Sequence, residues 1–247
     1  MQESSRARTQ KVCILLYHSI GFNKRYSTVK PSEFYRQMDY LRKNYEIVSL
    51  DKIIKFINGK IDLDKAVAIT FDDGYYDNYV YAFPYFKKYR LPATIFITTG
   101  ISEKFQNKKL FEGIILKKLG NNEIKKMSIY IDFGAHTKTH PFLDKISLKE
   151  AQKEIYDSKY KIEKIINKKI KYFAYPFFKY NNKIINLIKT LGFKAALNGP
   201  GLVRKGDNPF ILKRVVITSS TNFFLFKINL TEYYEWKINL KKFLLRS

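Results

Sequence analysis

Short runs of apolar residues alternate with longer amphipathic stretches along this chain, and this alternation limits the fold more than any other feature. An apolar run of about four to eight residues is typical of a strand buried on both faces. Amphipathic stretches between such runs predict the crossover helices of a parallel sheet. We therefore expect an α/β fold. The predicted strands cover residues 12–17, 46–50, 66–71, 93–98, 129–134, 171–175, 194–197 and 211–217.

Four of the amphipathic stretches predict helices. In the first, Phe34, Met38 and Leu41 recur at helical spacing. The third opens with Ser147 and Glu150 in the pattern of a capping box, and Gly192 ends the fourth as a C-terminal cap. The predicted helices cover residues 32–43, 76–89, 147–168 and 181–191.

Seven or eight strand–helix units in 247 residues fit either an open doubly wound sheet or a parallel barrel. Four polar residues and one proline follow the ends of several different predicted strands: His18, Asp72, Asp73, His136 and Pro176. A parallel barrel gathers its active site from the carboxyl ends of many strands, whereas an open sheet usually draws on two loops. The barrel is therefore the favoured architecture.

Two adjacent carboxylates, Asp72 and Asp73, leave the apolar strand 66–71 just before Gly74. Two carboxylates held this close have pKa values that are driven apart, and this suits the two groups to separate chemical roles. An Asp-Asp-Gly segment is also a common turn, chosen for its backbone conformation alone. By itself the segment would suit an aspartyl-phosphate site equally well.

Histidine is rare here, with three in the chain, yet His136 and His140 lie four residues apart in one short segment. Two imidazoles at this spacing can face one point, and a metal ion would satisfy both. Two histidines with one carboxylate leave a coordination position open for water, as in a catalytic zinc site. The third, His18, is either a strand-end core residue or a proton donor on the same face of the barrel.

Three segments together resemble the polysaccharide deacetylase family, carbohydrate esterase family 4. The resemblance covers residues 11–217 and implies a distorted (β/α) barrel of about seven parallel strands, a divalent metal that is usually zinc, and hydrolysis of an N-acetyl group from a sugar. It implies Asp72 as the general base and Asp73, His136 and His140 as metal ligands. The segments are TFDDG (70–74), GAHTKTHP (134–141) and FAYPF (173–177).

The chain departs from the family pattern in two places. Many members carry an arginine where this chain has Ala174, and Arg214 on the last strand is the predicted substitute. Many also carry a late catalytic histidine, but no histidine follows His140. The poly-N-acetylglucosamine deacetylase subgroup places a histidine on the first strand instead, so we expect His18 to be the general acid. Tyr175, Pro176 and Phe177 are expected to contact the substrate, with a backbone N–H near Phe177 stabilising the oxyanion.

We therefore predict a metal-dependent hydrolase that removes N-acetyl groups from a glycan or a lipid-linked glycan and releases acetate. The alternative is a basic carbohydrate-binding or nucleic-acid-binding protein without catalysis. The formal charge of +24 is compatible with nucleic acid, but 9 of the 46 basic residues are arginine and the lysines are dispersed. No nucleic-acid partner is expected.

The sequence also predicts three parts and a location. Residues 1–10 are expected to be a flexible tail, 11–218 the catalytic barrel, and 219–247 a basic, aromatic helical extension. The start lacks the apolar segment of a secretory signal, and no window is long enough to span a bilayer, so a cytoplasmic location is expected. The extension is either a helix packed on the barrel or a weak contact with the anionic inner face of the membrane.

Overall fold

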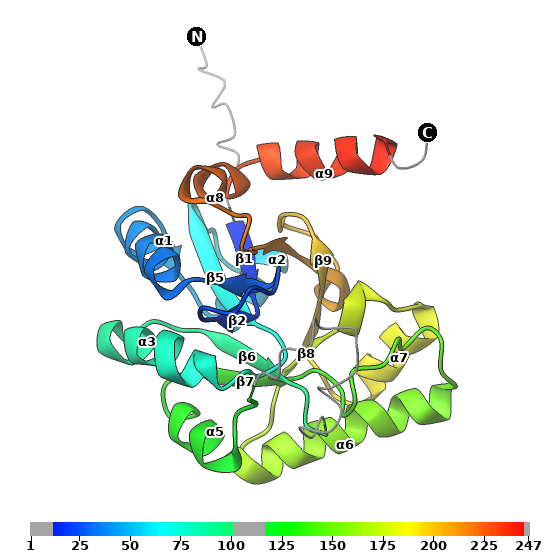
Figure 1. Ribbon diagram of the computed structural model, residues 1–247. Helices are drawn as coiled ribbons and strands as arrows, with labels where there is room; N and C mark the ends of the chain where they lie inside the picture. Colours follow the sequence, from blue (N-terminus) through cyan, green and yellow to red (C-terminus); the bar gives the residue numbers. More distant parts are fainter. Residues whose placement is uncertain (1–11, 101–116, 245–247) are drawn as a thin grey trace.

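The computed structural model of the chain describes residues 12–100 and 117–244, and it is a closed barrel of parallel strands (Figure 1). Strand β1 pairs with both β10 and β5, and these pairings close a ring of seven strands in the order β1-β10-β9-β8-β7-β6-β5. The predicted barrel is therefore confirmed. The strands of the ring are β1 (Val12–Tyr17), β5 (Ala66–Phe71), β6 (Thr94–Ile97), β7 (Asp132–Ala135), β8 (Tyr172–Ala174), β9 (Ala195–Pro200) and β10 (Leu212–Val216).

Three short strands lie outside this ring. Strand β4 (Glu46–Ile47) pairs with Ala66 and Val67 at the start of β5. Strand β6 pairs with the end of β5, at Thr70 and Phe71. Strands β2 (Ser19–Ile20) and β3 (Thr28–Val29) form a separate parallel pair in the loop after β1.

Helices cover the outside of the barrel, and the four predicted helices are present. The capping box of α6 is formed, with Ser147 and Glu150 bonding to each other's backbone N–H, and Gly192 follows α7 at φ 78°. The helices that follow the strands are α1 (Pro31–Asn44), α2 (Leu50–Ile57), α3 (Phe83–Tyr89) after a π-helix (Asn78–Ala82), α5 (Asn121–Met127), α6 (Leu148–Ile166) and α7 (Asn182–Thr190).

Two of these helices, α2 and α5, were not predicted. The strand expected over residues 46–50 stops at Ile47, because the Ser49 hydroxyl accepts a hydrogen bond from Lys52 N–H and starts α2. Helix α2 packs Ile53 and Phe56 against the lower part of the barrel interior. The bottom of the barrel is thus sealed, and the opposite end is left for the site.

Alternating side chains of the strands fill the inside and the outside of the barrel. Val12 and Ile14 of β1 pack with the interior group that contains Phe96, whereas Leu15 and Tyr17 pack with the residues beneath the helices. Gly134 of β7 is required by this packing, since a Cβ atom there would lie 2.4 Å from the Phe96 ring. Small interior residues thus make room for large ones.

Two further helices, α8 (Phe223–Asn229) and α9 (Tyr233–Leu244), follow β10. Helix α8 packs beside α1, and Phe226 within it and Leu230 directly after it are fully buried. Helix α9 continues from α8 along the outer edge of the molecule (Figure 1). Among the described helices, none is both long enough and apolar enough to cross a membrane.

Candidate metal centre and catalytic residues

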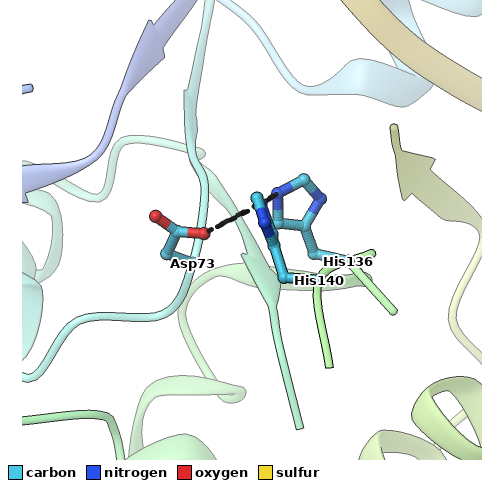
Figure 2. Close-up of side chains that lie close together, drawn as sticks. All are labelled: Asp73, His136 and His140. Atoms are coloured by element: carbon cyan, nitrogen blue, oxygen red, sulfur yellow. Dashed lines mark hydrogen bonds and ion pairs between the residues drawn. The ribbon is translucent and has the colours of Figure 1, made fainter. Parts of the chain in front are cut away.

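A carboxylate and two imidazoles converge at the carboxyl ends of the barrel strands (Figure 2). Asp73 follows β5, and His136 and His140 lie just after β7. The Nε2 atoms of the two histidines are 3.1 Å apart, and the Asp73 Oδ1 atom lies 3.7 Å from His136 Nε2 and 3.5 Å from His140 Nε2. The spacing of the two histidines in the sequence therefore does bring their rings to one point.

These distances fit a tetrahedral metal ion. Ligand atoms about 2.0–2.2 Å from zinc are roughly 3.4 Å from one another in a tetrahedron, and the three measured separations of 3.1–3.7 Å bracket that value. The Nδ1–H of His136 donates to the Ala174 carbonyl at 2.7 Å, so its Nε2 lone pair points into the cluster. Asp73, His136 and His140 can thus hold a divalent metal, with a coordination position left open.

The loop that carries the histidines is held by a residue that the sequence analysis missed. Glu154 of α6 accepts hydrogen bonds from the backbone N–H groups of Lys138 at 2.9 Å and Thr139 at 2.7 Å, and from the Thr139 hydroxyl. Thr137 and His140 have positive φ angles of 63° and 61°, a conformation that side chains disfavour. Glu154 therefore stabilises a strained loop. In the sequence it stands out only as one of the residues of the predicted helix 147–168.

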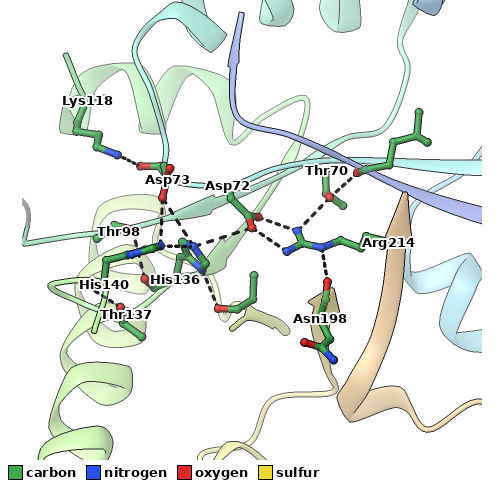
Figure 3. A network of polar contacts seen from close by, with 12 residues as sticks. Thr70, Asp72, Asp73, Thr98, Lys118, His136, Thr137, His140, Asn198 and Arg214 are labelled. Carbon is green, nitrogen blue, oxygen red and sulfur yellow. Dashed lines mark hydrogen bonds and ion pairs between the residues drawn. The ribbon is translucent and has the colours of Figure 1, made fainter. Parts of the chain in front are cut away.

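Asp72, the second carboxylate, points into the barrel toward Arg214 of β10 (Figure 3). Both Asp72 oxygens accept hydrogen bonds from the guanidinium group at 2.7 Å. Arg214 also donates to the Asn198 carbonyl, where the register between β9 and β10 shifts. Burial would raise the pKa of Asp72, but Arg214, His136 and His18 together lower it below its usual range. Asp72 is therefore ionised and can accept a proton.

Asp73 has different neighbours, so the two adjacent carboxylates are indeed separated in environment. Burial raises the pKa of Asp73, but Lys118 and the three histidines outweigh it and lower the pKa. The Lys118 ammonium donates to the Asp73 carbonyl at 2.8 Å and lies 3.8 Å from the centre of the Tyr75 ring. Arg25 donates to the Tyr75 hydroxyl. Lys118 and Arg25 carried no signal in the sequence, because both come from segments remote from Asp73.

His18 follows β1 and lies on the same face as the two carboxylates. Burial lowers its pKa, an effect that Asp73 and Asp72 partly oppose. Its Nδ1 atom is buried and has no hydrogen-bond partner among the described residues. Buried polar atoms are rarely left unpaired in folded proteins, so this nitrogen is available to a bound group.

The segment after β8 splits into a buried and an exposed part. Tyr175 is fully buried, and its hydroxyl donates to the Phe210 carbonyl, so its side chain is not brought to the site. Pro176 is also buried. Phe177 is exposed, with φ 54°, and its ring centre lies 4.4 Å from that of His140. Among the described residues, no acceptor is bonded to the Phe177 backbone N–H.

A closed parallel barrel with these side chains at its carboxyl ends defines a metal-dependent hydrolase. Residues 60–196 match the model of the polysaccharide deacetylase family. The chain belongs to this family, whose members are metal-dependent carbohydrate N-deacetylases.

Known proteins of similar sequence and structure agree with this assignment. The Bacillus subtilis protein YxkH is 29% identical over 213 residues, which cover 84% of this chain and 72% of YxkH. The poly-beta-1,6-N-acetyl-D-glucosamine N-deacetylase of Staphylococcus aureus is 28% identical over 210 residues, 79% of this chain and 69% of that enzyme. The Streptococcus pyogenes deacetylase PplD, solved in complex with acetate, is 25% identical with a TM-score of 0.76, over 89% of this chain and 98% of that chain.

Proposed function

We propose that this chain hydrolyses the N-acetyl group of an amino sugar within a glycan, with zinc held by Asp73, His136 and His140. The convergence of these three ligand atoms beside a separately held carboxylate, Asp72, is the observation that carries the proposal. Two imidazoles and one carboxylate are a donor set that suits zinc. When bound, the metal supplies Lewis-acid chemistry, which polarises the amide carbonyl and acidifies water.

The residues around the metal ligands have separate roles in the reaction. Asp72, ionised beside Arg214, accepts a proton from the attacking water as the hydroxyl adds to the carbonyl carbon. The Phe177 N–H, which bonds to no acceptor among the described residues, is available to the carbonyl oxygen as it becomes negative. The C–N bond then breaks, and His18 in its imidazolium form, which the charges of Asp73 and Asp72 favour against the effect of burial, delivers a proton to the departing nitrogen. The products are acetate and a free amino sugar.

The substrate class rests on family membership and on the named relatives. The Staphylococcus aureus relative carries the name of a poly-beta-1,6-N-acetyl-D-glucosamine N-deacetylase, which favours a polymer or a lipid-linked glycan of N-acetylated hexosamines. Contact with an anionic membrane surface from the cytoplasmic side is a separate part of the proposal. It is supported by the exposed aromatic side chains of α9.

Acetate release from a panel of N-acetylated glycans by the zinc-loaded full chain tests the proposal. Two matched variants separate the paired carboxylates. Asp72→Asn should retain zinc and lose nearly all turnover, whereas Asp73→Asn should lower the zinc content measured by atomic absorption. Equal zinc content in both variants would contradict the division of roles, and no acetate from any glycan would contradict the activity.

A further inference from the structure

The metal ligand Asp73 lies next to three side chains that come from other parts of the chain. The Lys118 ammonium donates to the Asp73 carbonyl at 2.8 Å (Figure 3). The same ammonium lies 3.8 Å from the centre of the Tyr75 ring, and Arg25, in the loop between β2 and β3, donates to the Tyr75 hydroxyl at 3.1 Å. We propose that Arg25, acting through the Tyr75 hydroxyl, positions the Asp73 carboxylate for the metal, and this inference rests on the metal centre of the proposed function.

The Tyr75 hydroxyl connects Arg25 to the Asp73 carboxylate. A guanidinium group can only donate hydrogen bonds, so the hydroxyl oxygen accepts from Arg25 and the hydroxyl hydrogen is left for another acceptor. Burial raises the pKa of Tyr75, and the Asp73 carboxylate raises it further, by its charge and by accepting a hydrogen bond from the hydroxyl. The guanidinium, the hydroxyl and the carboxylate are thus connected in a row.

Asp73 needs support because its backbone is strained. It has φ 74°, a left-handed conformation that residues other than glycine disfavour, and Gly74 follows at 67°. Leu119 N–H donates to the Gly74 carbonyl at 2.9 Å, and Lys118 beside it holds the Asp73 carbonyl. Backbone strain of this kind persists only where the surroundings enforce it, and it is concentrated at functional sites. These two bonds hold the backbone of the turn, and the Tyr75 hydroxyl holds the carboxylate.

Arg25 is itself held in place by its loop. The Asn23 side-chain carbonyl accepts hydrogen bonds from the Arg25 N–H at 3.2 Å and from the Thr28 hydroxyl at 2.6 Å. Arg25 is 8% exposed and Tyr75 is 5% exposed. In such an interior a hydrogen bond from a charged donor is strong, and its loss is costly. The guanidinium group is therefore fixed well enough to orient the hydroxyl.

A carboxylate that is already oriented loses less conformational freedom when it becomes a metal ligand. The Asp73 Oδ1 atom lies 3.7 Å and 3.5 Å from the Nε2 atoms of His136 and His140 without any metal between them. Groups that orient metal ligands in this way typically contribute roughly 10–100-fold to metal affinity. Arg25 and Tyr75 are positioning residues in this sense, because neither belongs to the group of ligand atoms.

Tyr75→Phe and Arg25→Met test the connection through the zinc affinity of the full chain, measured by competition with a chelator. Tyr75→Phe removes the hydroxyl and keeps the ring that Lys118 contacts, so zinc affinity should fall roughly 10–100-fold. Arg25→Met removes a cation, which by charge alone would raise the affinity for another cation. A fall in affinity in Arg25→Met therefore identifies the positioning effect. The double variant should bind zinc as Tyr75→Phe does, because Arg25 acts through the hydroxyl.

Tyr85→Phe on α3 is the matched control, since it removes a hydroxyl with the same kinds of partner. The Tyr85 hydroxyl donates to Asp39 at 2.6 Å and accepts from Arg42, and neither partner is a candidate metal ligand. This variant should bind zinc as the wild type does. Urea unfolding checks that each variant is folded, and if Tyr75→Phe does not fold, Arg25→Met decides alone.

Unchanged zinc affinity in Tyr75→Phe would overturn the inference, as would unchanged or raised affinity in Arg25→Met. Fully additive losses in the double variant would also overturn it. The proposed activity fails separately: no acetate release, with the zinc affinities as expected, would contradict the deacetylation and leave this inference supported. A wild type that binds no zinc would contradict the metal centre and this inference together.

Discussion

Arg214 of β10 and Asp72 after β5 form a two-point ion pair inside the barrel, with both N–O distances at 2.7 Å. Arg214 is fully buried, and its Nε–H donates to the Asn198 carbonyl. The pair fixes the direction of the Asp72 carboxylate, because a guanidinium group binds both oxygens at once. We therefore still expect Arg214 to take the place of the arginine that many family members carry at the position of Ala174.

Replacing Arg214 should affect both stability and turnover. Arg214→Met leaves the buried Asp72 charge unpaired, so we expect a loss of about 3–5 kcal/mol in the free energy of unfolding. Arg214→Lys keeps the charge but not the two-point geometry, and it should lower kcat while zinc is retained. Urea unfolding and acetate release measure the two effects. Full activity in Arg214→Lys would show that the orientation of Asp72 does not depend on two bonds.

His18 should be needed for turnover and not for metal binding. Its Nδ1 atom, which bonds to nothing in the described part of the chain, lies close enough to Asp72 and Asp73 for their charges to act on its pKa. If it donates the proton to the departing nitrogen, His18→Ala should lower kcat by about 10²–10⁴-fold. The zinc content should stay at the wild-type level, and the basic limb of the kcat profile should change. Normal turnover in this variant would make His18 a structural residue.

Glu154 should control metal affinity through the loop that it holds. It accepts three hydrogen bonds from Lys138 and Thr139, between the two histidine ligands. Glu154→Ala removes all three, and we expect zinc affinity to fall roughly 10–100-fold, as for other residues that orient metal ligands. Competition with a chelator measures the affinity. Lys153→Ala, on an exposed neighbouring position of α6, is the matched control and should leave it unchanged.

Asp77 should make the protein less stable as the pH rises. Burial raises its pKa to about 6, although Ser19 donates a hydrogen bond to it at 2.5 Å. The folded state therefore binds a proton more tightly than the unfolded state, and stability is lost as pH rises from about 4 through 6. Asp77→Asn should remove a penalty of up to about 3 kcal/mol at pH 7. A difference in urea midpoint between variant and wild type that is constant from pH 4 to 7 would contradict this.

The exposed face of α9 should mediate weak binding to anionic membranes. Trp236 is 57% exposed and Phe243 70%, whereas Tyr234 on the opposite face is buried. Trp236→Ser with Phe243→Ser should lower co-sedimentation with anionic liposomes at low salt, and Tyr156→Ser with Tyr160→Ser on α6 should not. Deleting residues 219–247 is a poor test, since it would remove the buried Phe226 and Leu230. Equal partitioning of both double variants would contradict a role for α9.

The strands of the barrel and the candidate metal-ligating side chains could be found in the sequence because their signals are local, although the choice of Asp73 over Asp72 as a ligand came from the family resemblance. Buried strands show as apolar runs, and the capping box of α6 and the glycine after α7 mark helix ends within a few residues. His136 and His140 sit in one segment, and Asp72 and Asp73 are adjacent. Each of these patterns depends on neighbours along the chain, and so one sequence suffices to find them. Helix α5 was missed because its seven residues span too few turns to show a helical period. Helix α2 was missed although Leu50, Ile53 and Ile57 recur at helical spacing, because the preceding strand was extended to residue 50.

Tertiary structure alone decided what the site residues touch. Arg214, which only the family resemblance pointed to, contacts Asp72 across 142 positions of the chain, and Lys118, which nothing in the sequence pointed to, contacts the Asp73 carbonyl across 45. Glu154 reaches the histidine loop only because α6 packs beside β7. These contacts depend on the closure of the ring by β1 and on which side of each strand faces inward, and neither can be found from sequence neighbours. The sequence determined which chemical groups are present, and the closed barrel determined their partners, because pairing between remote strands sets every distance in the site.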